Sequence, residues 1–123
     1  MKKYLFWFLT ISWASLTFYL TTIPNFHPSN DTFVSWLLSN SGHFFFFGIQ
    51  AVLLSLALPH WPLTITSLYG LFIEFIQLGI PGRSFDLFDW ALDTLGAVIF
   101  LAIIKKYENS YHWWSWIHRG DHR

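Results

Sequence analysis

The chain of 123 residues is 54% hydrophobic and 22% aromatic, and only 11% of its residues are charged, against roughly 25% in an ordinary soluble domain. A water-soluble core of this length cannot hide so much apolar surface, so several segments are expected to face lipid. The formal net charge of zero argues against nucleic acid as a partner. Because cysteine is absent, disulfides and thiolate metal sites are excluded.

Four apolar runs have a length suited to membrane-spanning helices, which need roughly 17–25 residues. We place these spans at residues 4–22, 42–58, 63–80 and 87–104. The first is expected to be a retained helix, because Trp7, Trp13 and Tyr19 make the run bulkier than is usual in a cleaved signal peptide. Thr10, Trp13 and Thr17 share one of its faces. The turn at residues 59–62 predicts an antiparallel hairpin of the second and third spans. Length and the lack of a repeat predict a single membrane domain over residues 1–123.

Two further segments are predicted to lie at the membrane surface. Residues 23–41 form the longest polar connection, and Asn30 or Asp31 is placed to cap a short interfacial helix that would end at Leu38. Phe33 and Trp36 would lie at headgroup level in that helix. The tail at residues 107–123 mixes tryptophans with histidines. We interpret it as a cytoplasmic interfacial segment rather than a metal site.

Basic residues predict the orientation of the chain. With four spans, both lysine pairs and the arginines of the tail fall on one side of the membrane, and only Arg83 falls on the other. The positive-inside rule therefore puts both termini in the cytoplasm. The expected class is an all-α integral membrane bundle of four transmembrane helices, with a short interfacial helix in the first outer loop. Its expected location is the cell membrane.

Charged and polar side chains gather in the third and fourth spans and in the turn between them. Ser67, Gly70, Glu74 and Gln77 recur at helical spacing, and so do Asp86, Asp89, Asp93 and Gly96. A carboxylate at the centre of a bilayer costs about 2.5–3.5 kcal/mol on insertion scales. Matching polar stripes on two adjacent helices are therefore expected to face each other or a shared cavity. The candidate ligand-binding residues are His43, Glu74, Gln77, Arg83, Asp86, Asp89 and Asp93.

The same residues resemble the VanZ-like membrane protein family, whose founding member is associated with teicoplanin resistance. The similarity covers about residues 40–104. It depends on His43-Phe44, on Glu74 with Gln77, on the run from Pro81 to Asp86, and on Asp89 followed by Asp93-Thr94-Leu95-Gly96. The resemblance implies a small multi-helix membrane domain linked to the bacterial cell envelope.

The chain departs from the family pattern at two places. It has Asn40-Ser41 where the family commonly has an Asp-Lys pair, and Asp93 where the family usually has Asn. The first difference removes a cation from the cluster and the second adds a possible anion.

Two main functional hypotheses and one structural alternative follow, beside a third functional possibility, a proton- or ion-coupled transporter that would use the same buried carboxylates. In the first hypothesis, Arg83 binds the phosphate or carboxylate of an envelope lipid or glycopeptide-related ligand. Glu74, Asp89 and Asp93 would hold a divalent cation such as Mg²⁺ against it, or one carboxylate would act as a general base with His43. Because Ser84 is more simply a helix cap, no nucleophile is assigned and enzyme activity stays open.

The second hypothesis is a non-catalytic membrane scaffold or shielding protein. Its aromatic outer segment with Phe33 and Trp36 would contact envelope precursors or a partner, and its buried polar residues would be structural. In the structural alternative, Asp86 caps the fourth span, Arg83 pairs with a carboxylate, and His43 and Glu74 form hydrogen bonds between helices. The sequence specifies neither an oligomeric state nor a substrate.

Overall fold

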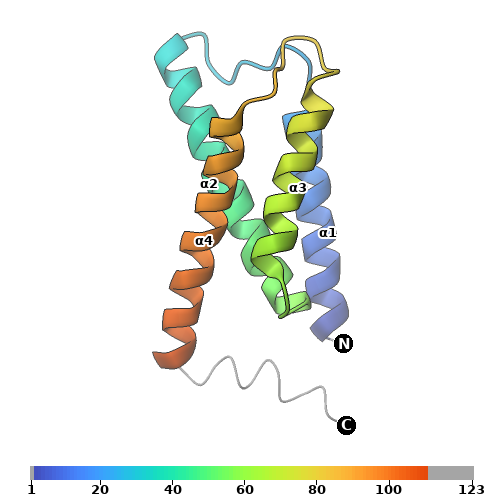
Figure 1. The fold of residues 1–123 in the computed structure, drawn as a ribbon, viewed down its shortest axis with the longest axis vertical. Coiled ribbons are helices and arrows are strands. Elements are labelled where there is room, and N and C mark those ends of the chain that lie inside the picture. The colour runs from blue at the N-terminus through green and yellow to red at the C-terminus, as the bar shows by residue number, and fades with distance from the viewer. Residues whose placement is uncertain (1, 111–123) are drawn as a thin grey trace.

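A computed structural model describes residues 2–110, which form four α-helices and no strands. The helices are α1 (Lys2–Thr21), α2 (Thr32–Ala57), α3 (Pro62–Gln77) and α4 (Leu87–Ser110). The start of α1, the turn between α2 and α3, and the end of α4 lie at one end of the bundle (Figure 1). The two longer connections lie together at the opposite end.

The distribution of side chains is the reverse of that in a soluble protein. Tyr4, Phe8 and Leu68 are among the large apolar side chains that are exposed, whereas Thr66, Glu74 and Asp93 are at most 1% exposed. Lipid solvates the apolar surface, and polar groups avoid hydrocarbon by turning inward. By length and composition, Lys2–Thr21, Thr32–Ala57 and Leu87–Glu108 can each cross a membrane. The all-helical membrane class is therefore confirmed.

The predicted short interfacial helix is not a separate element. Asp31 is the N-cap, and its carboxylate accepts a hydrogen bond of 3.0 Å from the backbone N–H of Val34. The helix then continues without a break for 26 residues. No proline interrupts the segment Ser39-Asn40-Ser41, so every backbone N–H remains available for the helix. The low helix propensity of these residues costs well under 1 kcal/mol each. Packing of the following turns outweighs that cost.

The third predicted span is shorter than expected. Helix α3 has 16 residues and ends at Gln77, which gives a length of about 24 Å against a hydrocarbon core of about 30 Å. After Gln77 the backbone N–H groups of Leu78, Gly79 and Ile80 donate to carbonyls three residues earlier, and the chain then turns at Gly82, whose φ is +75°. Helix α4 is longer than expected and continues to Ser110. Residues 111–123 of the predicted tail lie outside the described part of the chain.

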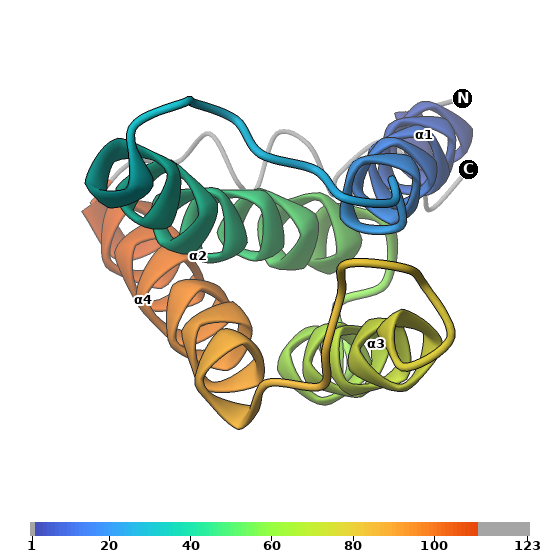
Figure 2. The same cartoon turned by 90° about the horizontal axis from the view of Figure 1, so that it is seen from above.

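Helices α2 and α4 form the most extensive contact in the bundle, and α1 and α3 pack against it (Figure 2). Two glycines allow the close approach of α2 and α4. A Cβ at Gly96 would collide with the backbone carbonyl of Phe44, and a Cβ at Gly48 would lie 2.6 Å from the ring of Phe100. Helix α1 is fastened to α2 by Trp13, whose indole N–H donates to the Phe46 carbonyl at 2.9 Å.

The close contact at Gly96 predicts a specific sensitivity. Gly96→Ala should lower the stability of the detergent-solubilised protein by about 1–3 kcal/mol, because overpacking against backbone cannot be relieved by a rotamer change. Thermal unfolding followed by circular dichroism measures the effect. Gly42→Ala is the matched control, since a Cβ there meets nothing within 4 Å. It should leave stability unchanged or raise it by up to about 1 kcal/mol through helix propensity. Equal behaviour of the two variants would contradict the packing.

Candidate functional site

The centre of the site is a contact between α2 and α4. Nδ1 of His43 lies 2.7 Å from Oδ1 of Asp93, and Nε2 of His43 lies 3.6 Å from Oδ2 of Asp89. His43 is 7% exposed and Asp93 is fully buried. When Asp93 is ionised, the ring N–H of His43 donates the hydrogen bond, which is charge-assisted and stronger than a neutral one. Either side chain would be costly in hydrocarbon without the other. The pair therefore links α2 to α4.

Glu74 brings α3 into the same cluster. Its Oε2 accepts a hydrogen bond of 2.9 Å from the backbone N–H of Asp86, just before α4 begins. The side chain of Asp86 accepts from the N–H of Phe88 at 2.9 Å and caps α4. Thus Glu74 and Asp86 together fix the entry of the chain into α4. The structural interpretation of Asp86 fits its contacts, since its carboxylate is turned to the helix end.

Small residues hold α3 close to α4 beside the cluster. A Cβ on Gly70 would lie 2.8 Å from Oδ2 of Asp93, so only glycine leaves room for that carboxylate. One turn earlier, the hydroxyls of Ser67 and Thr94 form a hydrogen bond of 2.8 Å. The indole N–H of Trp90 donates to the Ser67 carbonyl at 3.0 Å. The polar stripes of α3 and α4 therefore contact each other.

Arg83, in the turn between α3 and α4, and Gln77, at the end of α3, bind the end of α1. Arg83 donates from Nε to the carbonyl of Ile23 at 3.1 Å and from Nη2 to the carbonyl of Leu20 at 3.0 Å. Gln77 donates to the carbonyl of Thr21 at 2.9 Å. These carbonyls need partners because they belong to the last turn of α1 or directly follow it. Within residues 2–110 Arg83 forms no ion pair with a carboxylate, so the pairing expected in the structural alternative is wrong.

Arg83 keeps a positive charge in this position. Partial burial lowers its pKa, while the negative charges of Asp89 and Glu74 act in the opposite direction. A guanidinium stays protonated in proteins. Its carbon lies 5.5 Å from the centre of the Phe26 ring, which is a cation–π distance.

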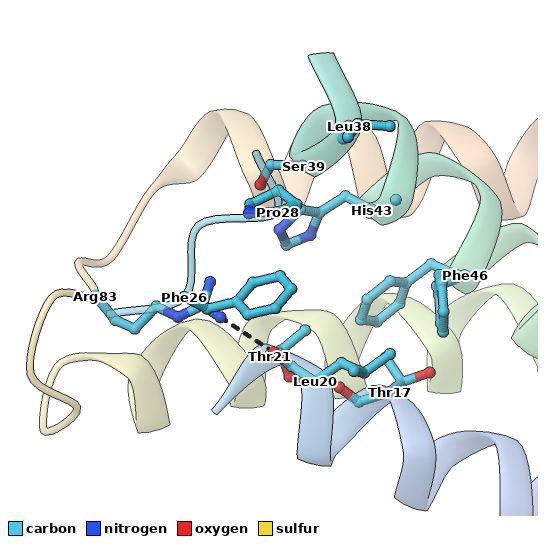
Figure 3. Close-up of a pocket in the computed structure, with 12 residues that line it drawn as sticks. Thr17, Leu20, Thr21, Phe26, Pro28, Leu38, Ser39, His43, Phe46 and Arg83 are labelled. Atoms are coloured by element: carbon cyan, nitrogen blue, oxygen red, sulfur yellow. Dashed lines mark hydrogen bonds between the residues drawn. The ribbon is translucent and has the colours of Figure 1, made fainter. Parts of the chain in front are cut away.

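A pocket of about 260 Å³ separates Arg83 from the His43 side of the bundle. Figure 3 shows His43 projecting into this pocket from α2, with Arg83 and Phe26 on the opposite side and Thr17 and Thr21 of α1 along one wall. The remaining lining is largely apolar and includes Leu20, Pro28, Leu38, Phe46 and Phe47. The pocket therefore combines one cation and one imidazole with a wall that suits an acyl or prenyl chain.

The seven predicted site residues fall into three places. His43, Glu74, Asp89 and Asp93 form the buried cluster, Arg83 and Gln77 bind the end of α1, and Asp86 caps α4. Sequence reasoning missed the contribution of α1 and the first loop, namely Thr17, Thr21 and Phe26. Thr17 was visible as part of a polar face. The backbone carbonyls that Arg83 binds have no signal in the sequence, since every residue carries one.

Comparison with known proteins identifies one family. A family model described as VanZ/LLP1 matches residues 5–108, which is most of the chain. The match extends beyond residues 40–104, where the sequence resemblance was placed, and includes α1. No curated protein and no solved structure gives a significant match.

The His43–Asp93 contact predicts strong coupling between the two residues. His43→Phe or Asp93→Leu alone should each destabilise the protein by about 1–3 kcal/mol, because each leaves a buried polar partner unsatisfied. The double variant should cost clearly less than the sum, since neither polar group remains. Thermal unfolding in detergent gives the four corners of the cycle. Strict additivity would show that the two side chains do not interact.

Proposed function

The chain belongs to the VanZ/LLP1 family, and we propose that it binds or acts on the headgroup of an envelope lipid or precursor in the bacterial cell membrane. The proposed binding site is the pocket lined by His43 and Arg83. Residues of the buried cluster and the outer turn, His43, Glu74, Gln77, Arg83, Asp86, Asp89 and Asp93, would bind the ligand or position the groups that do. Teicoplanin tolerance is a proposed consequence.

The observation that carries the proposal is the state of Arg83. Its hydrogen bonds within residues 2–110 go to backbone carbonyls and its guanidinium lies near an aromatic ring, so no carboxylate forms a direct ion pair with it. A guanidinium has five N–H donors, and the two bonds to carbonyls leave others for a phosphate or carboxylate. The adjoining apolar walls would take the lipid chain. Arg83 is thus fixed in place before the ligand arrives, which reduces the entropy lost on binding.

The proposed topology is four spans with both termini in the cytoplasm. Lys2 and Lys3 lie at the start of α1, and Lys105 and Lys106 lie near the end of α4. Both helix ends are at one end of the bundle (Figure 1). Arg83 and the pocket lie toward the other end, which the positive-inside rule places outside the cell. Helix α3, about 24 Å long, is shorter than the hydrocarbon core. It would cross with its polar C-terminal end near the outer interface, where the bilayer can accommodate the missing length.

His43 offers a route from binding to chemistry. A histidine oriented by a carboxylate is a common general base, and His43 touches both the pocket and Asp93. Turnover of a bound headgroup is therefore to be tested beside binding. The electrostatic role of Arg83 is the same in either case.

The proposal predicts selective loss of anionic lipid binding in Arg83→Gln. Phosphatidylglycerol should bind the unaltered protein in preference to phosphatidylcholine. The variant should bind phosphatidylglycerol about tenfold or more weakly, because charged hydrogen bonds contribute about 1.5–3 kcal/mol. Native mass spectrometry of the detergent-solubilised protein measures the bound lipid. Lys105→Gln removes one exposed cation at the far end and should bind lipid normally. Equal losses in both variants would refute a specific role of Arg83.

A scaffold or shielding function is the second candidate, favoured by two exposed aromatic side chains. Phe33 and Trp36 are 68% and 56% exposed in the first turns of α2, and their rings stack with centroids 6.2 Å apart. Such residues suit a headgroup layer or a partner surface. In this candidate function the buried cluster would serve only to hold the helices together.

Teicoplanin tolerance separates the two candidates. Expression in a susceptible bacterium should raise the inhibitory concentration of teicoplanin. If headgroup binding is responsible, Arg83→Gln should abolish the rise while Phe33→Ser with Trp36→Ser retains it. The scaffold candidate predicts the opposite pattern. Membrane levels of each variant, measured by immunoblot, must match for the comparison to count.

A further inference from the structure

The buried cluster contains more acidic than basic groups. Glu74, Asp89 and Asp93 surround a single imidazole, His43. Protonation of His43 can balance one carboxylate at most. Arg83 makes its hydrogen bonds to the end of α1 and its connection, and within residues 2–110 it makes no ion pair with the cluster. Buried charge that is left unpaired costs several kcal/mol, so the cluster requires protons or a further cation.

Two carboxylate oxygens point to where that cation would bind. Oε1 of Glu74 and Oδ2 of Asp93 are buried and have no hydrogen-bond partner among the described residues. The other oxygen of each group is engaged, by the N–H of Asp86 and by His43 respectively. Both side chains are 0% exposed. Bulk water therefore does not solvate these oxygens, and an unmade interaction at each costs about 1–3 kcal/mol or more.

The donor atoms are close enough to share one ion. One ligand atom from each of His43, Glu74 and Asp93 lies within 4.8 Å of the others. Around an ion with bonds of about 2.0–2.2 Å, ligand atoms lie about 3.3–3.6 Å apart in tetrahedral geometry and up to about 4.4 Å apart when they are trans. Side-chain shifts of about 1 Å would therefore complete the geometry. We propose that His43, Glu74 and Asp93 form a binding site for one divalent transition-metal ion such as Zn²⁺ or Mn²⁺.

The ligand set favours this class of ion over Mg²⁺ and Ca²⁺. One imidazole and two carboxylates suit Zn²⁺ and other first-row ions, whereas Mg²⁺ and Ca²⁺ take oxygen ligands. The set also differs from the three carboxylates that the sequence suggested for Mg²⁺. Oδ2 of Asp89 lies 3.6 Å from His43 Nε2, so its negative charge adds to the attraction for a cation. The pocket reaches His43 (Figure 3), and an ion entering from it would pass the imidazole.

The site has a structural consequence, because its three ligands come from α2, α3 and α4. One ion would join three helices and add its binding energy to the stability of the bundle. In the competing arrangement, the carboxylates are kept neutral by protons alone. That arrangement predicts no saturable metal binding and no stabilisation by metal.

The test is metal binding by the full chain in detergent, purified with a tag that lacks histidine and stripped with EDTA. Zn²⁺ and Mn²⁺ are titrated by isothermal calorimetry, and bound metal is counted by mass spectrometry after dialysis. We expect one ion per chain and at least a tenfold loss of affinity in Glu74→Gln and Asp93→Asn. Asp31→Asn, an exposed cap whose side-chain oxygen is retained, should bind like the unaltered chain. Mg²⁺ at equal concentration should not displace Zn²⁺.

One further variant and one further measurement test the interpretation. The tail has three histidines of its own, so the chain with His112→Gln, His118→Gln and His122→Gln combined should bind metal normally. Metal should raise the melting temperature of the unaltered chain and of Asp31→Asn, but not that of Glu74→Gln. Helical circular dichroism and gel filtration establish that each variant is folded.

Several results would overturn the proposal: absence of binding to the unaltered chain, binding undiminished in Glu74→Gln and Asp93→Asn, loss only in the tail variant, or displacement by Mg²⁺. No lipid is present in these assays. A failure here would therefore leave headgroup binding by Arg83 untouched, and a failure of the lipid assay would leave the metal site untouched.

Discussion

The hydrogen bond between His43 and Asp93 is the constraint on which the rest of the structure depends. At 2.7 Å it joins α2 to α4 through a carboxylate that is completely buried. A carboxylate in hydrocarbon is so unfavourable that it must find a partner within the bundle. Gly70 leaves space for Asp93, and Gly96 lets the backbones of α2 and α4 approach. Polar pairing and small residues therefore fix the helix positions that general apolar packing would leave free.

Burial of the cluster also separates two kinds of chemistry. On one side of His43 lie the acidic groups, with two oxygens that have no hydrogen-bond partner among residues 2–110. On the other side lies a largely apolar pocket that extends to the cation of Arg83. Of the four residues of the buried cluster, His43 is the one that lines the pocket. A ligand in the pocket and an ion in the cluster would thus influence each other through His43, without sharing a binding position.

The sequence predicted the helical class and the convergence of the polar residues because both depend on periodicity. Polar residues that recur at helical spacing in apolar runs are expected to face the interior of the bundle, and Glu74 and Asp93 are both fully buried there. The sequence alone could not predict that α2 continues through Ser39–Ser41, because the choice between a break and a continuous helix depends on tertiary packing. Nor could it predict that Arg83 binds the end of α1, since the acceptors are backbone carbonyls. The length of α3 was overestimated because Leu78 and Ile80 extend the apolar run beyond the last helical turn.

The most direct test of this account is disulfide formation between α3 and α4 in a chain that has no cysteine of its own. The hydroxyl oxygens of Ser67 and Thr94 lie 2.8 Å apart, so cysteine sulfurs in their place would lie close to the S–S distance of about 2.05 Å, while Asp93 and its bond to His43 stay intact. Ser67→Cys combined with Thr94→Cys should cross-link rapidly in native membranes upon mild oxidation, as a shift in gel mobility. Ser67→Cys with Leu95→Cys, whose second position is 48% exposed, should not. Cross-linking of the control pair in place of the first would contradict the contact between the polar stripes of α3 and α4, and with it the site.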